Sequence, residues 1–213
     1  MGRRRNVLIK KVTFIGGGSA KFVRELAVDM FHFPELQDIH ISLMDIDLPS
    51  AERTRKIVQK MIDDRKLPAT VDATTDQRKA LDGADYVVIT IMVGGFECYC
   101  SDVEIPSRYG VHQSVSDTAW PGWVFRIVRT APVLRKIAAD LKELAPNAWI
   151  LNYANPMAMN MWTLFACGHR KAVGLFHSIQ GTAPYLAKLA GVNPAEINFT
   201  AGGINHVNFY IRL

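Results

Sequence analysis

Three glycines and a serine stand together near the start of the chain, at Gly16-Gly17-Gly18-Ser19. They follow the β-branched and aromatic run Lys11–Ile15, which predicts a buried strand, and they precede a helical pattern that begins near residue 20. Glycines in such a turn let a pyrophosphate approach the backbone, and the start of the helix offers N–H groups at its positive end. The context predicts a dinucleotide site at these four residues, although the usual third glycine position holds Lys21.

An acidic residue follows the next predicted strand, which spans residues 39–44. Asp45 stands where dinucleotide-binding folds carry an acid that bonds the ribose hydroxyls. A carboxylate there would repel a 2′-phosphate, so the sequence favours NAD over NADP. Asp47 is a second candidate for this role. The alternative is a structural glycine turn with a vestigial site.

Further residues that could do chemistry lie later in the chain. Asn155 follows a predicted strand, and its amide can donate to and accept from sugar hydroxyls, or it can stabilise an Asx-Pro turn. His206 has the imidazole that Mn²⁺ or Zn²⁺ binds, although a hydrogen-bonded core histidine is the better interpretation from the residues alone. Arg126 and Arg129, one helical turn apart, face either a site or solvent.

Alternating strands and helices must position these groups. Strands are predicted at residues 11–15, 39–44, 70–73, 86–90, 149–151 and 171–175, and a last strand at 204–213. Helices are predicted from 20 to about 33, after Pro49, and at 125–144, 157–166 and 182–190. This alternation is typical of an α/β fold with a parallel sheet.

The composition is that of an ordinary globular enzyme, with 213 residues, 49% apolar residues and a net charge of +5. Part of this charge is the leader Arg3-Arg4-Arg5 with Lys10 and Lys11, which we interpret as a solvated lead-in rather than a nucleic-acid or lipid site. No secretory signal or membrane-length apolar run is visible. The odd set Cys98, Cys100 and Cys167 makes a disulfide framework improbable, so we expect a cytoplasmic protein.

The last predicted strand stops at Leu213 without a turn or a polar tail, so we expect the chain to be a portion of something longer. A boundary is predicted near Val192-Asn193-Pro194. Residues 1–193 would form a Rossmann-like, doubly wound parallel sheet of the lactate dehydrogenase type, and residues 194–213 would begin an incomplete substrate domain.

Six segments resemble the NAD- and manganese-dependent glycosidases of glycoside hydrolase family four, in that family's order and at its spacing. They are residues 12–19, 44–47, 116–118, 152–160, 177–181 and 203–206. The segments at 155–160 and 177–182 look most like the α-galactosidase branch. The resemblance covers nearly the whole chain after the basic leader.

The resemblance implies hydrolysis of a small α-glycoside by oxidation at C3, elimination and re-addition of water. The implied cofactors are NAD and a divalent metal, usually Mn²⁺. It implies that Asn155 binds substrate, that His206 is a metal ligand, and that Asp117 and His177 serve catalysis. The expected partners are the glycoside and possible identical subunits, with no nucleic acid and no membrane.

The sequence also departs from the family pattern. Phe176 stands where the family usually has a cysteine metal ligand, and a phenyl ring cannot coordinate a metal. Trp120 and Trp123 replace small residues, and Tyr210 lies too close to His206 to be the family's tyrosine base. Activity of this chain by itself is therefore doubtful. The alternatives are a 2-hydroxy-acid dehydrogenase, and a catalytically inactive NAD-binding remnant.

Overall fold

The computed structural model describes residues 10–115, 120–176 and 178–212. Six parallel strands form one sheet in the order β3-β2-β1-β4-β5-β6. The strands are β1 (Lys11–Ile15), β2 (His40–Met44), β3 (Thr70–Thr74), β4 (Tyr86–Ile89), β5 (Trp149–Asn152) and β6 (Ala172–Gly174). The order reverses between β1 and β4, so the carboxyl ends of these two strands flank the crevice where this fold binds ligands. The predicted Rossmann-like fold is confirmed.

Helices cover both faces of the sheet, as a fully parallel sheet requires. On one face, α1 (Ala20–His32) and α2 (Leu48–Arg65) bury side chains such as Val23 and Val58 against β1 and β2. On the other face, α5 (Pro121–Leu144) and α6 (Met157–Ala166) pack Leu134, Ile137 and Leu164 on β4 and β5, with the short α3 (Gln77–Leu81) beside them. The inner strands β1, β2 and β4 are largely apolar on both sides, in keeping with their place between helices.

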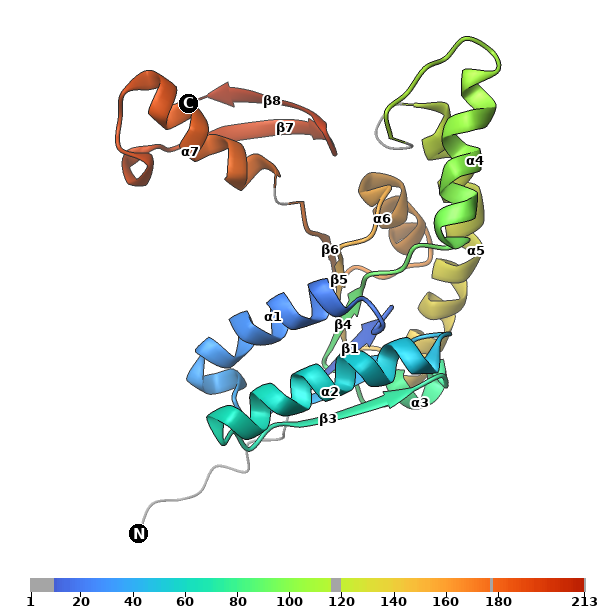
Figure 1. Cartoon of the computed structure of the whole chain (residues 1–213), viewed down its shortest axis with the longest axis vertical. Coiled ribbons are helices and arrows are strands. Elements are labelled where there is room, and N and C mark those ends of the chain that lie inside the picture. The colour runs from blue at the N-terminus through green and yellow to red at the C-terminus, as the bar shows by residue number, and fades with distance from the viewer. Residues whose placement is uncertain (1–9, 116–119, 177, 213) are drawn as a thin grey trace.

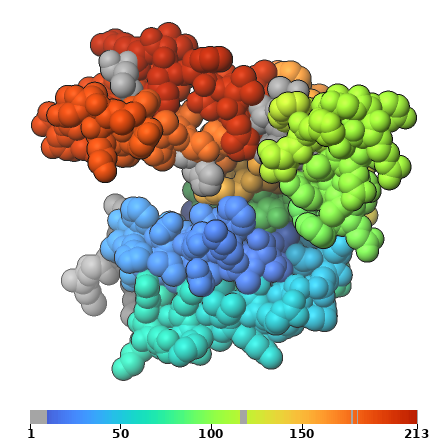
Figure 2. Space-filling view, turned by 45° about the horizontal axis from the view of Figure 1, so that its top comes forward, coloured from blue at the N-terminus to red at the C-terminus, as the bar shows by residue number. Residues whose placement is uncertain are grey.

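Two helical pieces extend beyond the sheet in Figure 1. The helix α4 (Gly95–Ser107) runs beside the first half of α5. At the other side, α7 (Ser178–Ala190) packs with the antiparallel hairpin of β7 (Thr200–Ile204) and β8 (Val207–Arg212). Figure 2 shows α7 and this hairpin at the upper left of the molecule, above α1 and α2, with α4 at the upper right. Short 3-10 turns at Pro34–Leu36 and Pro194–Glu196 complete the chain.

The predicted elements are largely confirmed, with three differences. The strand predicted at 204–213 is wrong as a single strand, because the chain turns at Asn205 and His206 between two antiparallel strands. Helices α3 and α4 lie where no helix was predicted. Helix α7 begins at Ser178, four residues before its predicted start.

The three cysteines are free thiols, in agreement with the prediction of no disulfide framework. In the part of the chain that the structure describes, every helix is too short or too polar to span a bilayer. Lys10 pairs with Asp85 at 3.0 Å, and the Lys11 ammonium donates to the carbonyl oxygens of Lys79 and Asp82. These two lysines therefore tie the first strand to its neighbours.

Candidate functional site

The glycine turn fits tightly between the carboxyl ends of β1, β2 and β4. Gly16 has φ +96°, and a Cβ atom there would lie 2.8 Å from the Thr90 hydroxyl oxygen. A Cβ on Gly17 would lie 2.8 Å from the Leu43 Cα. Both positions therefore need glycine, the first for its backbone conformation and the second for close approach.

The three glycine amides are already used inside the protein. The N–H groups of Gly16 and Gly17 both donate to the Met44 carbonyl, at 2.9 and 2.8 Å. The Gly18 N–H donates to the Asp45 carboxylate at 2.8 Å. The N–H groups available to an anion are therefore those of the first turn of α1, which lack partners within the helix. Ser19 precedes this turn at the N-cap position, but its side chain makes no capping hydrogen bond.

Asp45 links the end of β2 to the glycine turn. One carboxylate oxygen accepts from Gly18, and the other accepts from the Asp47 N–H at 3.0 Å. These bonds hold the carboxylate at the mouth of the crevice, where ribose hydroxyls lie in dinucleotide-binding folds. Sequence reasoning placed the acid at this end of β2 but could not place its side chain against the turn.

Asp47 has a different role. It is the N-cap of α2, and it accepts hydrogen bonds from the backbone N–H and the hydroxyl of Ser50. The bond from the Ser50 hydroxyl lowers the pKa of the Asp47 carboxyl. Asp45 and not Asp47 lines the crevice.

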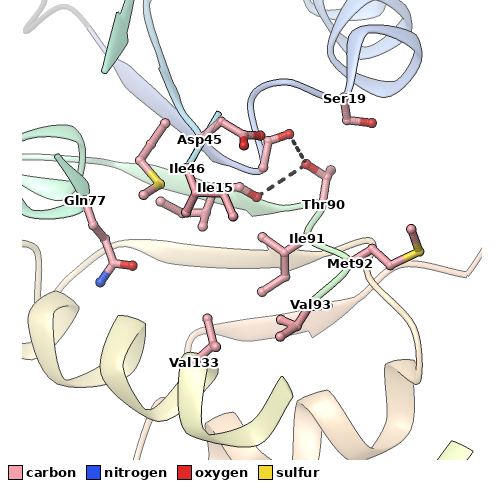
Figure 3. A pocket seen from close by; sticks show the side chains of 12 residues that line it. Ile15, Ser19, Asp45, Ile46, Gln77, Thr90, Ile91, Met92, Val93 and Val133 are labelled. Atoms are coloured by element: carbon pink, nitrogen blue, oxygen red, sulfur yellow. Dashed lines mark hydrogen bonds between the residues drawn. The ribbon is translucent and has the colours of Figure 1, made fainter. Parts of the chain in front are cut away.

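A hollow of about 290 Å³ opens at this place. Figure 3 shows Asp45 and Thr90 near each other at its upper side, Gln77 at the left and Val133 at the bottom. The Thr90 hydroxyl donates to the carbonyl oxygens of Ile15 and Gly16, and it thereby joins β4 to the glycine turn. Apart from Asp45, Ser19, Gln77 and Thr90, the lining side chains are apolar. A mostly apolar hollow with a few polar groups is typical of a site for a flat organic ring with a polar tail.

Sequence reasoning missed Thr90 and Gln77. The signal for Thr90 was a hydroxyl residue at the carboxyl end of a buried strand beside the topological switch point. Gln77 gave no such signal, because it begins a five-residue helix that the pattern did not predict.

A second group of polar residues lies beyond β5. The peptide bond between Asn155 and Pro156 is cis. The Ala154 carbonyl, just before it, accepts hydrogen bonds from the side-chain amides of Asn152 and Asn160, at 2.9 and 3.0 Å. Both of these asparagines are fully buried. They anchor the backbone that presents Asn155, and neither was predicted.

The β7–β8 turn meets the ends of β5 and β6. The Asn205 amide donates to the Asn155 side-chain oxygen at 3.2 Å. The rings of Phe176 and His206 meet nearly at right angles, with centroids 4.8 Å apart. Asn155, Phe176 and His206, which are far apart in the sequence, are therefore gathered at one edge of the fold.

These described residues do not fit a divalent cation at the place that the resemblance implies. The resemblance implies a pair of metal ligands at positions 176 and 206. Phe176 offers no donor atom, and its ring lies against His206, the one member of this pair that could ligate a metal. No three His, Cys, Asp or Glu side chains gather into a metal-binding group within residues 10–115, 120–176 and 178–212.

Two predicted catalytic residues, Asp117 and His177, lie outside the described residues. Of the two arginines, Arg129 forms an ion pair and is only partly exposed. Its guanidinium pairs with both carboxylate oxygens of Asp102, at 2.8 and 2.6 Å, and Asp102 is 1% exposed. This pair joins α4 to α5, and the carboxylate raises the pKa of Arg129.

Comparison with known proteins identifies relatives of this chain. The model of the family described as "Family 4 glycosyl hydrolase" matches residues 11–192. An α-galactosidase from Rhizobium meliloti is 39% identical over 202 residues, which are 94% of this chain and 41% of the relative. An α-galacturonidase from Lachnoclostridium phytofermentans is 36% identical and is matched over 94% of this chain and 45% of its own length. The chain thus spans less than half the length of these two curated relatives.

Solved structures share the fold. A 6-phospho-α-glucosidase from gut microorganisms, in complex with NAD and Mn²⁺, has a TM-score of 0.81 and 20% identity, over 95% of this chain and 46% of that one. A lactate dehydrogenase from Eimeria maxima, with NADH and oxamate, has a TM-score of 0.65 and 14% identity, over 94% and 54% of the two chains. The second likeness shows the sheet alone and gives no support to the dehydrogenase alternative.

Proposed function

Because this chain belongs to family 4 of the glycosyl hydrolases, we propose that it forms the NAD-binding part of an enzyme that hydrolyses α-galactosides. The observation that carries the proposal is the Asp45 carboxylate fixed against the Gly18 amide at the crevice between β1 and β4. The α-galactosidase from Rhizobium meliloti supports the substrate class. The α-galacturonidase relative makes uronosides the substrates to compare.

Different residues of the chain would bind different parts of the dinucleotide. Amide groups in the first turn of α1 would bind the pyrophosphate, and Asp45 would accept hydrogen bonds from the adenosine ribose. The apolar side chains of Ile46 and Val133, which line the hollow, would contact the adenine ring. NAD⁺ bound there would supply the acceptor for a hydride that leaves a carbon of the sugar.

Asn155 would orient the sugar. Its side-chain oxygen accepts from Asn205, and its N–H₂ group would donate to a sugar hydroxyl. Asp117 and His177 remain our proposed catalytic residues on the ground of the resemblance. We also keep the division at residues 193 and 194 as a proposal.

A specific observation favours a second candidate function. The contact between Phe176 and His206 occupies the place of the implied metal ligands. We therefore derive no step through a metal, and an NAD-binding protein without hydrolytic activity is the alternative.

Calorimetric titration with NAD⁺ tests the cofactor proposal. We expect Asp45→Asn to weaken NAD⁺ binding about tenfold or more, because hydrogen bonds to a charged group contribute about 1.5–3 kcal/mol. Asp47→Asn is the matched control, since it removes a carboxylate two residues away that does not line the crevice. Equal binding by wild type and Asp45→Asn, or no binding by wild type, would refute the proposal.

Hydrolysis of 4-nitrophenyl α-galactoside tests the first candidate function. Release of nitrophenol that depends on added NAD⁺ would support the glycosidase and refute the second candidate. NAD⁺ binding without any release would agree with the second candidate and equally with an NAD-binding part assayed by itself, and release that is independent of NAD⁺ would contradict both candidates.

A further inference from the structure

One side chain fastens the β7–β8 turn to the start of α6. Asn205 is 4% exposed, and its backbone has φ +47°. Its side-chain oxygen accepts a hydrogen bond from the Ala158 N–H at 3.0 Å, and its side-chain amide donates to the Asn155 oxygen at 3.2 Å. A single buried amide therefore contacts a helix end and the proposed sugar-binding residue at once.

The helix end needs such a partner. The first N–H groups of a helix have no acceptor within the helix, and a capping side chain normally supplies one. In α6 the N-cap residue is Pro156, which makes no side-chain capping bond. The Ala158 N–H lies in the first turn of α6, and Asn205 supplies its acceptor from 47 residues further along the chain.

The second bond fixes the orientation of Asn155. A side-chain amide has an oxygen on one edge and an N–H₂ group on the other, and either edge can face a given neighbour. Because the Asn205 N–H₂ group donates to Asn155, the Asn155 oxygen must point to the turn. The donor edge of Asn155 is thereby set in one direction.

We propose that Asn205 is a positioning residue for Asn155: it caps α6 in place of a local N-cap and holds the Asn155 amide in one orientation. The proposal rests on the proposed function in one respect, which is the role of Asn155 in binding the sugar. The two hydrogen bonds and their consequences can be tested without a sugar.

Two substitutions separate the two bonds without straining the turn. Residues with φ near +47° are mostly glycine, asparagine and aspartate. Asn205→Gly keeps the backbone conformation and removes both side-chain bonds. Asn205→Asp keeps an acceptor for the Ala158 N–H and loses the donor to Asn155. Asn208→Ala is the matched control, because among the described residues the Asn208 amide donates to the Asn205 backbone carbonyl, at 2.7 Å, and the variant keeps both side-chain bonds of Asn205.

The experiment is NMR on the ¹⁵N-labelled whole chain. Two readouts are followed, the hydrogen-exchange rate of the Ala158 amide and the side-chain N–H₂ resonances of Asn155. In Asn205→Gly we expect exchange at Ala158 to accelerate about fivefold, the effect of one net hydrogen bond, and the Asn155 resonances to shift. In Asn205→Asp we expect protection at Ala158 to remain while the Asn155 resonances shift. The control should change neither readout.

Unchanged Ala158 exchange and unchanged Asn155 resonances in Asn205→Gly would overturn the proposal. If Asn205→Gly fails to fold, Asn205→Asp decides: unshifted Asn155 resonances in that variant would overturn it. NAD⁺ titration of the same wild-type sample keeps the two proposals distinct. Failure to bind NAD⁺ would refute the proposed function, whereas a shift of the Asn155 resonances in the Asn205 variants reports on the bond between these two side chains.

Discussion

At the scale of single residues, Phe176 gives the sharpest prediction. Its ring lies against His206, where the family resemblance implies a cysteine and a histidine that share a metal. We expect Phe176→Cys to raise the affinity for Mn²⁺ on the order of tenfold or more, because a thiolate adds a ligand beside the imidazole. Calorimetric titration with Mn²⁺ in the presence of NAD⁺ measures the change.

Phe176→Ala is the control for this prediction, since it removes the ring without adding a donor atom. If wild type binds Mn²⁺ as tightly as Phe176→Cys, the chain has ligands other than the implied pair, and the statement that these residues do not fit a metal is wrong.

The glycine turn and Asp45 were predictable because their signal is local. A buried strand, three glycines and a helix are consecutive in the sequence, and an acid ends the next strand. The role of Asn205 was not predictable, because it depends on a contact with Ala158 across 47 residues. The buried amides of Asn152 and Asn160 were missed for a related reason: polar residues in a motif suggest ligand binding before they suggest a backbone anchor.

At the scale of elements, the pairing of α4 with α5 rests on the ion pair between Asp102 and Arg129. We expect Asp102→Ala to lower the free energy of unfolding by about 2 kcal/mol, because it removes the two charge-assisted hydrogen bonds that the buried carboxylate accepts from the partly exposed Arg129. Urea denaturation at neutral pH measures the loss. Glu104→Ala is the matched control, since Glu104 is an exposed acid on the same helix. Equal free energies of unfolding of the two variants would show that the ion pair between Asp102 and Arg129 does not stabilise the fold.

The strands were predicted well because runs of β-branched and aromatic residues bounded by glycine or proline have few alternatives. Helix α4 was missed because its sequence lacks a regular apolar face. It begins at the second of two glycines, contains Pro106, and turns Asp102 inward, where the pattern expects an apolar residue. The β7–β8 hairpin was missed because its turn, Asn205-His206, contains no glycine, and Asn205 itself adopts the positive φ.

At the scale of the whole molecule, the two sheets should differ in local stability. Strands β1 and β4 lie inside a six-stranded sheet with helices on both faces, whereas β7 and β8 pair only with each other. We expect backbone amides of β7 and β8 to exchange with solvent at least ~100-fold faster than those of β1 and β4, because two-stranded sheets are marginal by themselves. Hydrogen exchange followed by mass spectrometry tests this.

The exchange rates of the α7 backbone amides serve as the internal comparison. This helix packs with the hairpin, and the Tyr210 hydroxyl of β8 donates to the Ile179 carbonyl of α7. Equal protection of the hairpin and the central strands would mean that the molecule opens as one cooperative unit. That result would also count against the proposed division at residues 193 and 194.

The crevice at the switch point has a consequence for the lifetime of the protein. Its walls come from β1, β2 and β4 together with the glycine turn, and the Thr90 hydroxyl joins two of these elements. A dinucleotide bound there would contact segments that separate when the chain unfolds, so it would bind the folded form alone. Mass action then adds about 2.7 kcal/mol to the folded state when free dinucleotide exceeds its Kd a hundredfold. On the proposed function, the supply of NAD would therefore govern how long each copy survives proteolysis, independently of catalysis.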